Sequence, residues 1–296
     1  ERLGVTRFFL RDSNWSPDFK INALTARDLF KKETAKNVDG VIAVDLTFVQ
    51  NMLAIIGPVT LADYNEVISA DNLFERGEYH SEIGFFPGST QKRDFFGALT
   101  RALINKIVSD LPSPTTNNQQ PVTSSIPWLD LLTETKKALE QKHLLMTFDN
   151  QNLASYVTLN GWDSPMPPKS FNPADDTGAT RDFLAISEAN LGANKVNRQI
   201  MREIFYEMTI GRDADLVGKL TISYANESQA ETWPAGKYVN YLRVYVPFAS
   251  GLLEVNNGGN TDAALVEVTN QGNLTTFATY VEVPIKSTRQ ITFTYR

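Results

Sequence analysis

Side chains suited to binding phosphate and a divalent cation gather near the start of the chain. The mainly apolar run at residues 5–10 predicts a buried strand, and Pro17 disfavours helix at the residue that precedes it. We therefore expect an irregular turn at the end of a strand, where open α/β sheets commonly bind ligands. The four residues of the set are Arg11, Asp12, Asn14 and Asp18.

This set has two interpretations. In the functional one, Arg11 and Asn14 bind a phosphate or pyrophosphate, and Asp12 or Asp18 holds magnesium, since phosphoryl transfer requires the developing charge to be neutralised. Arg11, Asp12 and Asp18 are then the catalytic residues. In the structural interpretation, the Asp and Asn side chains accept hydrogen bonds from their own backbone and Arg11 forms a salt bridge.

Strands and helices should alternate around this turn. Residues 38–44 predict a short apolar strand, and Asp45 is a suitable N-cap for the helix that follows it. Gly57 and Pro58 should end that helix, and apolar spacing predicts a longer helix over residues 92–111. Alternation of this kind predicts an N-terminal α/β domain with a mostly parallel, covered sheet.

The middle of the chain is mixed. Residues 112–127 are rich in Pro, Ser, Thr, Asn and Gln and predict a linker or an insertion. Helical spacing returns at 128–141 and a strand follows at 143–148. Further along, residues 182–187 predict a strand and residues 196–206 a helix.

The pattern changes again from about residue 211. Short runs of apolar and β-branched residues are separated by Asn- and Gly-rich turns, which predicts an antiparallel β-sandwich. The expected strands are 216–225, 238–246, 252–255, 263–269, 275–283 and 288–295. The chain is therefore expected to comprise an α/β domain at 1–111, incomplete at its N-terminus, a linker at 112–127, an α/β continuation at 128–210 and the sandwich at 211–296.

Composition excludes several classes of site. The chain has no cysteine and two histidines, so disulfides, thiolate catalysis and Cys- or His-rich metal sites are excluded. Any metal would lie on carboxylates, which favours magnesium or calcium. A net charge of -6 argues against nucleic acid as a partner, because binding to phosphate backbones requires clustered basic residues.

Several segments together resemble a bacterial family, the domain-of-unknown-function family 4012. They are residues 11–19 (RDSNWSPDF), 38–61 (VDGVIAVDLTFVQNMLAIIGPVTL), 142–144 (KHL), 188–195 (EANLGANK) and 241–247 (YLRVYVP). This resemblance extends over nearly the whole chain. It implies a bacterial protein exported to the cell envelope or cell exterior, with a membrane tether upstream of Glu1.

A more distant resemblance, confined to the segment before residue 111, is to the LytR-CpsA-Psr phosphotransferases. It implies transfer of a glycopolymer from a polyprenyl pyrophosphate carrier to the cell wall. That family places two arginines just before and at the start of the helix that here begins near Lys92. Lys92 and Arg93 are the nearest cations and join the ligand-binding set, whereas Gln91 and either Pro87 or Gly88 occupy the expected arginine positions.

Three functions follow as expectations. The first is an exported envelope protein that binds an envelope glycopolymer or another surface protein. The second is the phosphotransferase, with magnesium as its cofactor. The third is a structural subunit of a surface layer or appendage, which associates with itself through exposed strand edges of the sandwich.

Overall fold

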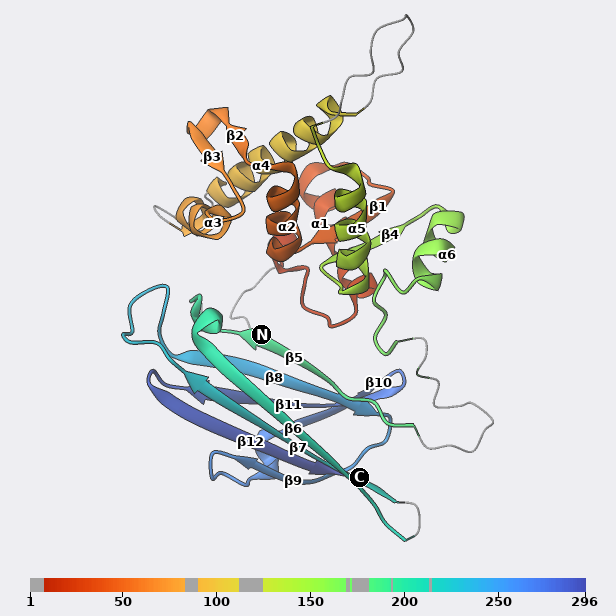
Figure 1. The fold of residues 1–296 in the computed structure, drawn as a ribbon. Helices are drawn as coiled ribbons and strands as arrows, with labels where there is room; N and C mark the ends of the chain where they lie inside the picture. The colour runs from red at the N-terminus through yellow and green to blue at the C-terminus, as the bar shows by residue number, and fades with distance from the viewer. Residues whose placement is uncertain are drawn as a thin grey trace, which may run out of the picture. The chain divides into compact units, whose positions relative to one another are not determined.

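The computed structural model describes residues 8–82, 90–111, 125–168, 171, 181–192, 194–212 and 215–296. The chain divides into two compact units, Phe9–Pro165 and Met166–Arg296 (Figure 1). The predicted linker around residues 112–124 lies outside the described residues. None of the described helices is long and apolar enough to cross a membrane.

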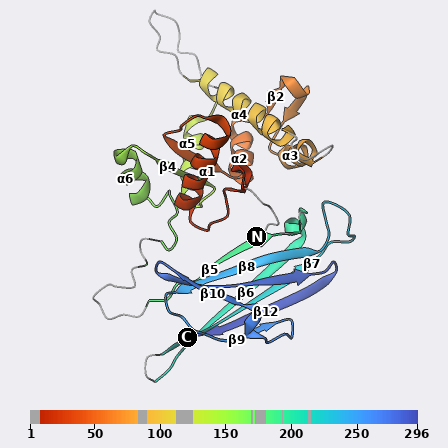
Figure 2. The same cartoon turned by 180° about the vertical axis from the view of Figure 1, so that it is seen from behind.

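The N-terminal unit is mostly helical. Its helices and strands are α1 (Phe19–Thr34), β1 (Gly40–Val44), α2 (Leu46–Ile56), β2 (Val59–Leu61), β3 (Glu66–Ile68), α3 (Leu73–Glu82), α4 (Gln91–Ser109), α5 (Trp128–Glu140), β4 (Leu144–Phe148) and α6 (Gln151–Leu159). The hairpin β2–β3 lies with α3 and α4 at one side of the unit (Figures 1 and 2).

Local sequence determines where these helices begin and end. The side chain of Asp45 caps α2 by accepting a hydrogen bond from the Phe48 amide, as predicted, and Asn150 caps α6 in the same way. Helix α2 ends at Gly57, whose φ of 79° lies in the region that favours glycine. The helices predicted at 92–111 and 128–141 are confirmed as α4 and α5.

The predicted parallel sheet is wrong. Strand β1 pairs with β4 in the antiparallel direction, from Gly40 opposite Phe148 to Val44 opposite Leu144, and β2 and β3 form a separate antiparallel hairpin. Alternation of strands and helices indicated a parallel sheet, but it does not establish that successive strands share a sheet. Here β1 and β2 belong to different two-stranded sheets, and β1 pairs with a strand from far along the chain.

The strand predicted to end at Leu10 is not formed by its described residues. Phe8 and Phe9 are 44% and 39% exposed, and Leu10–Asp12 form one turn of 3₁₀ helix. The Leu10 amide donates to Glu33 Oε1 at 2.8 Å, which attaches this turn to α1 in place of a neighbouring strand. The earlier residues of the predicted strand, up to Arg7, lie outside the described part.

Besides a small cluster of Ile56, Ile126 and Leu131, two apolar clusters hold the N-terminal unit together. One gathers residues of α2, the β2–β3 hairpin, α3 and α4 around the fully buried Phe95. The other packs Phe48 of α2 against Ala138 and Leu139 of α5 and Leu144 of β4. Helix α2 therefore contributes to both clusters, and its capped N-terminus lies at the end of β1.

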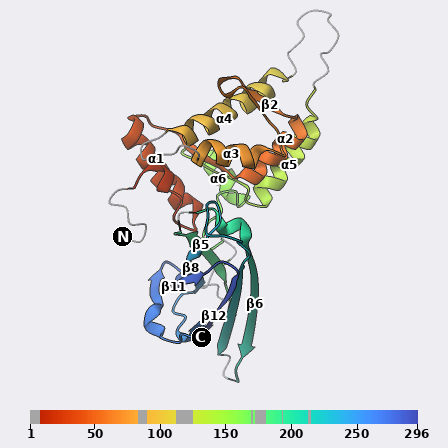
Figure 3. The same cartoon turned by 90° about the vertical axis from the view of Figure 1, so that its left-hand side faces the viewer.

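The C-terminal unit consists of two four-stranded antiparallel sheets arranged as a sandwich (Figure 3). One sheet has the strand order β10-β11-β8-β5 and the other the order β6-β7-β12-β9. The strands are β5 (Ala185–Asn190), β6 (Ile200–Ile210), β7 (Leu216–Asn226), β8 (Tyr238–Pro247), β9 (Leu252–Asn257), β10 (Glu267–Gln271), β11 (Leu274–Val283) and β12 (Ser287–Tyr295).

The core of this unit comes from alternate residues of both sheets. Phe277 of β11 and Phe293 of β12 stack with ring centroids 6.3 Å apart, and neither ring is exposed to solvent. Burial alternates along β7 from Gly218 onward, as expected for a strand with one face toward a core. The sandwich predicted from the C-terminal strand pattern is therefore confirmed as two sheets.

The helix predicted at 196–206 is wrong. Val196–Gln199 form a short 3₁₀ helix, and the following residues form β6, which pairs with β7 along its whole length from Ile200 opposite Asn226 to Ile210 opposite Leu216. Eleven consecutive pairings with a neighbouring strand outweigh a weak local preference for helix. Strands β5 and β6 thus join the sandwich although they precede residue 211.

Candidate functional site

The four residues predicted near the N-terminus form what we call the elbow, residues 11–18. Asp18 caps α1, with its Oδ1 accepting from the amides of Lys20 at 2.8 Å and Ile21 at 3.3 Å. The side-chain oxygen Oδ1 of Asn14 accepts from Asn22 Nδ2 at 2.8 Å. Each of these side chains therefore orders the start of α1.

Arg11 and Asp12 lie on the 3₁₀ turn before this point. Asp12 Oδ2 accepts from the Phe9 amide at 2.9 Å, and its Oδ1 is 3.8 Å from Arg11 Nε. The Arg11 side chain is 68% exposed, with its guanidinium 5.0 Å from the centroid of the Phe9 ring. Across the described residues, no three His, Asp or Glu side chains are grouped so as to hold a metal ion. Binding of phosphate or magnesium by the elbow stays a prediction.

Lys92 and Arg93 lie in the first turn of α4 and are exposed. Arg93 is 77% exposed and places Nε 3.3 Å from Asp94 Oδ1 on the neighbouring residue. No described contact joins these cations to the elbow. Pro87 and Gly88, one of which occupies an expected arginine position in the sequence comparison, lie outside the described residues.

An imidazole–carboxylate pair lies at the end of the β1–β4 sheet. His143 Nδ1 is 2.6 Å from Asp45 Oδ2, and the Asp45 amide donates to the His143 carbonyl oxygen at 3.1 Å. Asp45 thus caps α2 with one oxygen and contacts His143 with the other. The sequence identified Asp45 only as a cap, because the pairing of β1 with β4 is what brings together two residues 98 positions apart.

This pair lines a cavity of about 240 Å³. Asn14 is the one member of the predicted elbow set among its lining residues. The cavity is lined by Asn14, Ser16, Pro17, Phe19, Asn22, Ala43, Val44, Asp45, Lys142, His143, Leu145 and Ser164.

The second histidine, His80, belongs to an internal ion-pair cluster. Glu66 accepts two hydrogen bonds from Arg76 and lies 3.1 Å from His80 Nε2, while Phe95 stacks on the imidazole with a centroid separation of 4.6 Å. Hydrogen bonding to Arg76 lowers the pKa of the Glu66 carboxyl against the opposing effect of burial, and the hydrogen bond to His80 lowers it further. The ring packing and the shared carboxylate give this cluster a structural role.

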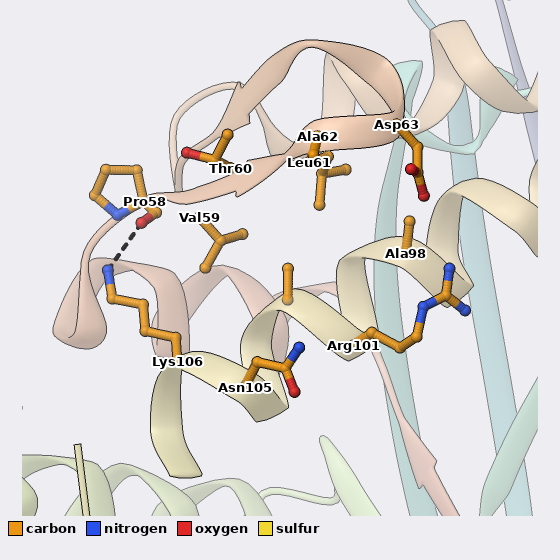
Figure 4. A pocket seen from close by; sticks show the side chains of 11 residues that line it. Pro58, Val59, Thr60, Leu61, Ala62, Asp63, Ala98, Arg101, Asn105 and Lys106 are labelled. Atoms are coloured by element: carbon orange, nitrogen blue, oxygen red, sulfur yellow. Dashed lines mark hydrogen bonds between the residues drawn. The ribbon is translucent and has the colours of Figure 1, made fainter. Parts of the chain in front are cut away.

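A larger open groove of about 470 Å³ runs between residues 58–63 and the second half of α4 (Figure 4). Lys106 closes one end by donating from Nζ to the Pro58 carbonyl oxygen at 2.8 Å. Arg101 and Asp63 lie at the other end. Asn105 lies between the two ends on the helix side, and Thr60 lies on the strand side. The side chains of Thr60, Arg101 and Asn105 line this groove without a hydrogen bond or ion pair to the described residues.

Comparison with known proteins gives a match to a protein family. A family model described as a protein of unknown function (DUF4012) matches residues 3–79, which include the elbow, α1, β1, α2 and the β2–β3 hairpin. No curated protein and no solved structure matches the chain. The match supports the first resemblance over residues 3–79 and leaves the resemblance to the LytR-CpsA-Psr family without support.

Proposed function

We propose that this protein is exported to the cell envelope, where it binds an envelope glycopolymer through the groove between residues 58–63 and α4. The observation that carries the proposal is the unpaired polar lining of the groove. Arg101 and Asn105 of α4 contribute a guanidinium and an amide to the lining of one open depression, and Thr60 lies on its strand side. The elbow residues, in contrast, already hydrogen bond within their own segment.

The chemistry of the lining suits an anionic glycopolymer. Such a chain combines many hydroxyls with phosphate or carboxylate groups, and an unpaired guanidinium forms charge-assisted, forked hydrogen bonds with those groups. Arg101 and Lys106 are five residues apart on α4, which separates their Cα atoms by about 7.5 Å along the helix axis. An elongated ligand can therefore contact both ends of the groove. The small side chains of Ala98 and Ala102 also line the groove and leave room for sugar rings.

The envelope location is supported by the family resemblance, which also implies a membrane tether upstream of this sequence. The groove adds a reason to look for the partner among surface polymers. A groove open along its length admits an internal segment of a long chain, whereas an enclosed pocket admits only a small molecule or a chain end. Another surface protein remains the alternative partner.

Calorimetric titration of the protein with an anionic cell-wall glycopolymer tests the proposal. Arg101→Ala should weaken binding by about tenfold or more, because it removes charge-assisted hydrogen bonds worth about 1.5–3 kcal/mol. Arg93→Ala is the matched control, since Arg93 is equally cationic, lies on the same helix and does not line the groove. Arg93→Ala should leave the affinity unchanged.

Other outcomes of this titration would contradict the proposed site or the proposed function. Equal losses in the two variants indicate diffuse charge attraction and contradict a site in the groove. A loss of affinity in Arg11→Ala alone would indicate that the polymer binds at the elbow and not in the groove. An absence of heat with any envelope polymer overturns the proposed function.

Strand β6 favours a second candidate, a structural surface subunit that associates with itself. It is an edge strand of eleven residues, and its exposed side chains include Met201 at 59%, Phe205 at 62% and Ile210 at 73%. Long apolar edge strands readily pair with another chain. Sedimentation of the wild type and of Phe205→Lys distinguishes the candidates, because the structural candidate requires assemblies that the variant loses.

A further inference from the structure

The Asp45–His143 pair fixes the proton on one nitrogen of the imidazole. Asp45 Oδ2 lies 2.6 Å from Nδ1 and accepts its proton, so a neutral His143 presents Nε2 as a hydrogen-bond acceptor. We propose that Nε2 accepts a hydrogen bond from a hydroxyl group of a sugar unit bound in the 240 Å³ cavity. The cavity is then a second ligand site, separate from the α4 groove. This inference does not depend on the proposed function.

The pair is held rigidly. Asp45 Oδ1 accepts from the Phe48 amide at 2.9 Å, so the carboxylate cannot rotate without uncapping α2. The His143 amide donates to the Ala138 carbonyl oxygen at 2.9 Å, and its own carbonyl accepts from Asp45. An imidazole fixed at its backbone and at Nδ1 loses little conformational entropy when Nε2 binds a ligand.

The Nε2 atom is available for such a bond. Within the described part of the chain, the one hydrogen bond of the His143 ring is the Nδ1 contact, and the side chain is 31% exposed. Ser164 adds a hydroxyl to the cavity wall and Asn14 adds the amide group of its side chain. These groups provide both donors and acceptors, as the hydroxyls of a sugar require.

The shape of the cavity suits one small ring. Its volume lies below the roughly 300–1,000 Å³ of typical small-molecule sites. Phe19, Pro17 and Leu145 form apolar walls, against which the C–H face of a sugar can pack while its hydroxyls reach the polar groups. An internal stretch of polymer fits the open groove of α4 better than this cavity.

The charges around the cavity favour a neutral ligand. The N-terminus of α2 contributes Asp45, and the segment between α5 and β4 contributes Lys142 and His143. Lys142 Nζ donates to the Gly161 carbonyl oxygen at 2.7 Å, while the elbow and α1 contribute the uncharged Asn14, Ser16 and Asn22.

Nitrogen NMR of the imidazole rings tests the proposal, with methyl α-glucopyranoside and inorganic phosphate as separate probes. We expect the Nδ1–H tautomer at His143 and a shift of its Nε2 resonance on addition of the glucoside but not of phosphate. The spectrum is simple because His80 is the other histidine of the chain, and its unchanged signals serve as an internal control.

Asp45→Asn gives the decisive variant. The asparagine carbonyl still caps α2, but its amide group donates to Nδ1 and so moves the ring proton to Nε2. The glucoside affinity should fall by about tenfold, as expected for loss of one hydrogen bond to the ligand. Asp149→Asn is the matched control, because Asp149 binds Arg27 outside the cavity.

Several results overturn the inference. They are the Nε2–H tautomer in the wild type, equal responses of His143 and His80 to the glucoside, a response to phosphate alone, and an unchanged affinity in Asp45→Asn. None of these results depends on binding in the α4 groove, so failure here is distinguishable from failure of the proposed function.

Discussion

Tyr224 and Glu188 join the two sheets of the sandwich. The Tyr224 hydroxyl of β7 donates to Glu188 Oε1 of β5 at 2.5 Å, and the Tyr224 side chain is fully buried. Glu188 Oε2 also accepts from Arg202 of β6 at 2.5 Å. A hydrogen bond between strands of different sheets constrains how one sheet lies on the other, which apolar packing alone specifies less strictly.

This buried link predicts loss of stability at alkaline pH. Burial, followed by the negative charge of Glu188, raises the pKa of Tyr224 above its usual value of 10.0. The unfolded state therefore releases the phenol proton first, and the free energy of unfolding should fall as pH rises above about 10. Denaturant unfolding at about pH 8 and about pH 11 should show a smaller fall for Tyr224→Phe than for the wild type. Tyr280→Phe, at a side chain 46% exposed, is the control and should retain the fall of the wild type.

Phe95 should contribute strongly to the stability of the N-terminal unit. Its ring is fully buried and contacts the rings of Tyr64, His80 and Phe96. Phe95→Ala should lower the free energy of unfolding by about 3–5 kcal/mol, because it leaves a cavity among these rings. Leu129→Ala, at a side chain 77% exposed, should change it by about 0.5 kcal/mol or less. Similar losses of unfolding free energy for Phe95→Ala and Leu129→Ala in chemical denaturation would contradict the packing described for α4.

The Glu66 cluster predicts a loss of stability in acid. The pKa of Glu66 is lowered in the folded state by its hydrogen bonds to Arg76 and His80. Its contribution is therefore complete above the unfolded value near 4.5 and is lost as pH falls through the folded value. Glu66→Gln should reduce stability at neutral pH and flatten the acid limb of a plot of unfolding free energy against pH. An unchanged acid limb would show that Glu66 is not paired in solution.

Two glycines should respond oppositely to alanine. A Cβ at Gly40 would lie 2.6 Å from both Phe148 Cδ1 and the Thr147 carbonyl oxygen, so Gly40→Ala should separate β1 from β4 and cost about 1–3 kcal/mol. A Cβ at Gly97 of α4 meets Arg101 Nη1 at 3.5 Å, an ordinary contact. Gly97→Ala should stabilise the protein by about 0.5–1 kcal/mol through helix propensity. Thermal melts of both variants provide the measurement.

Purified protein with magnesium or manganese should show no pyrophosphate cleavage and no glycopolymer transfer above background. Phosphoryl transfer depends on several converging cations, and each lost donor typically costs on the order of 100-fold in rate. The elbow offers Arg11, which is 68% exposed and close to Asp12. Turnover that Arg11→Ala abolishes would instead support the phosphotransferase.

The sequence determined the elements whose signals are local. Asp45 with the apolar spacing after it specified α2, and Gly57 with Pro58 specified its end, because capping and termination depend on residues within one turn. The C-terminal strands were predictable for a related reason. Each has a repeat of two residues and is bounded by turn residues such as Asn256–Gly259 and Asn270–Asn273.

Tertiary structure decided what depends on distant partners. The antiparallel pairing of β1 with β4 and the strand conformation of β6 arise from contacts with segments that no local pattern identifies. The same holds for the Asp45–His143 pair. Local residues alone predicted Asp45 as a helix cap, but the pairing of β1 with β4 placed the imidazole of His143 2.6 Å from its second oxygen. Local hydrogen bonds are determined by neighbours in the chain, whereas a site built across a sheet is determined by which strands pair and in which direction.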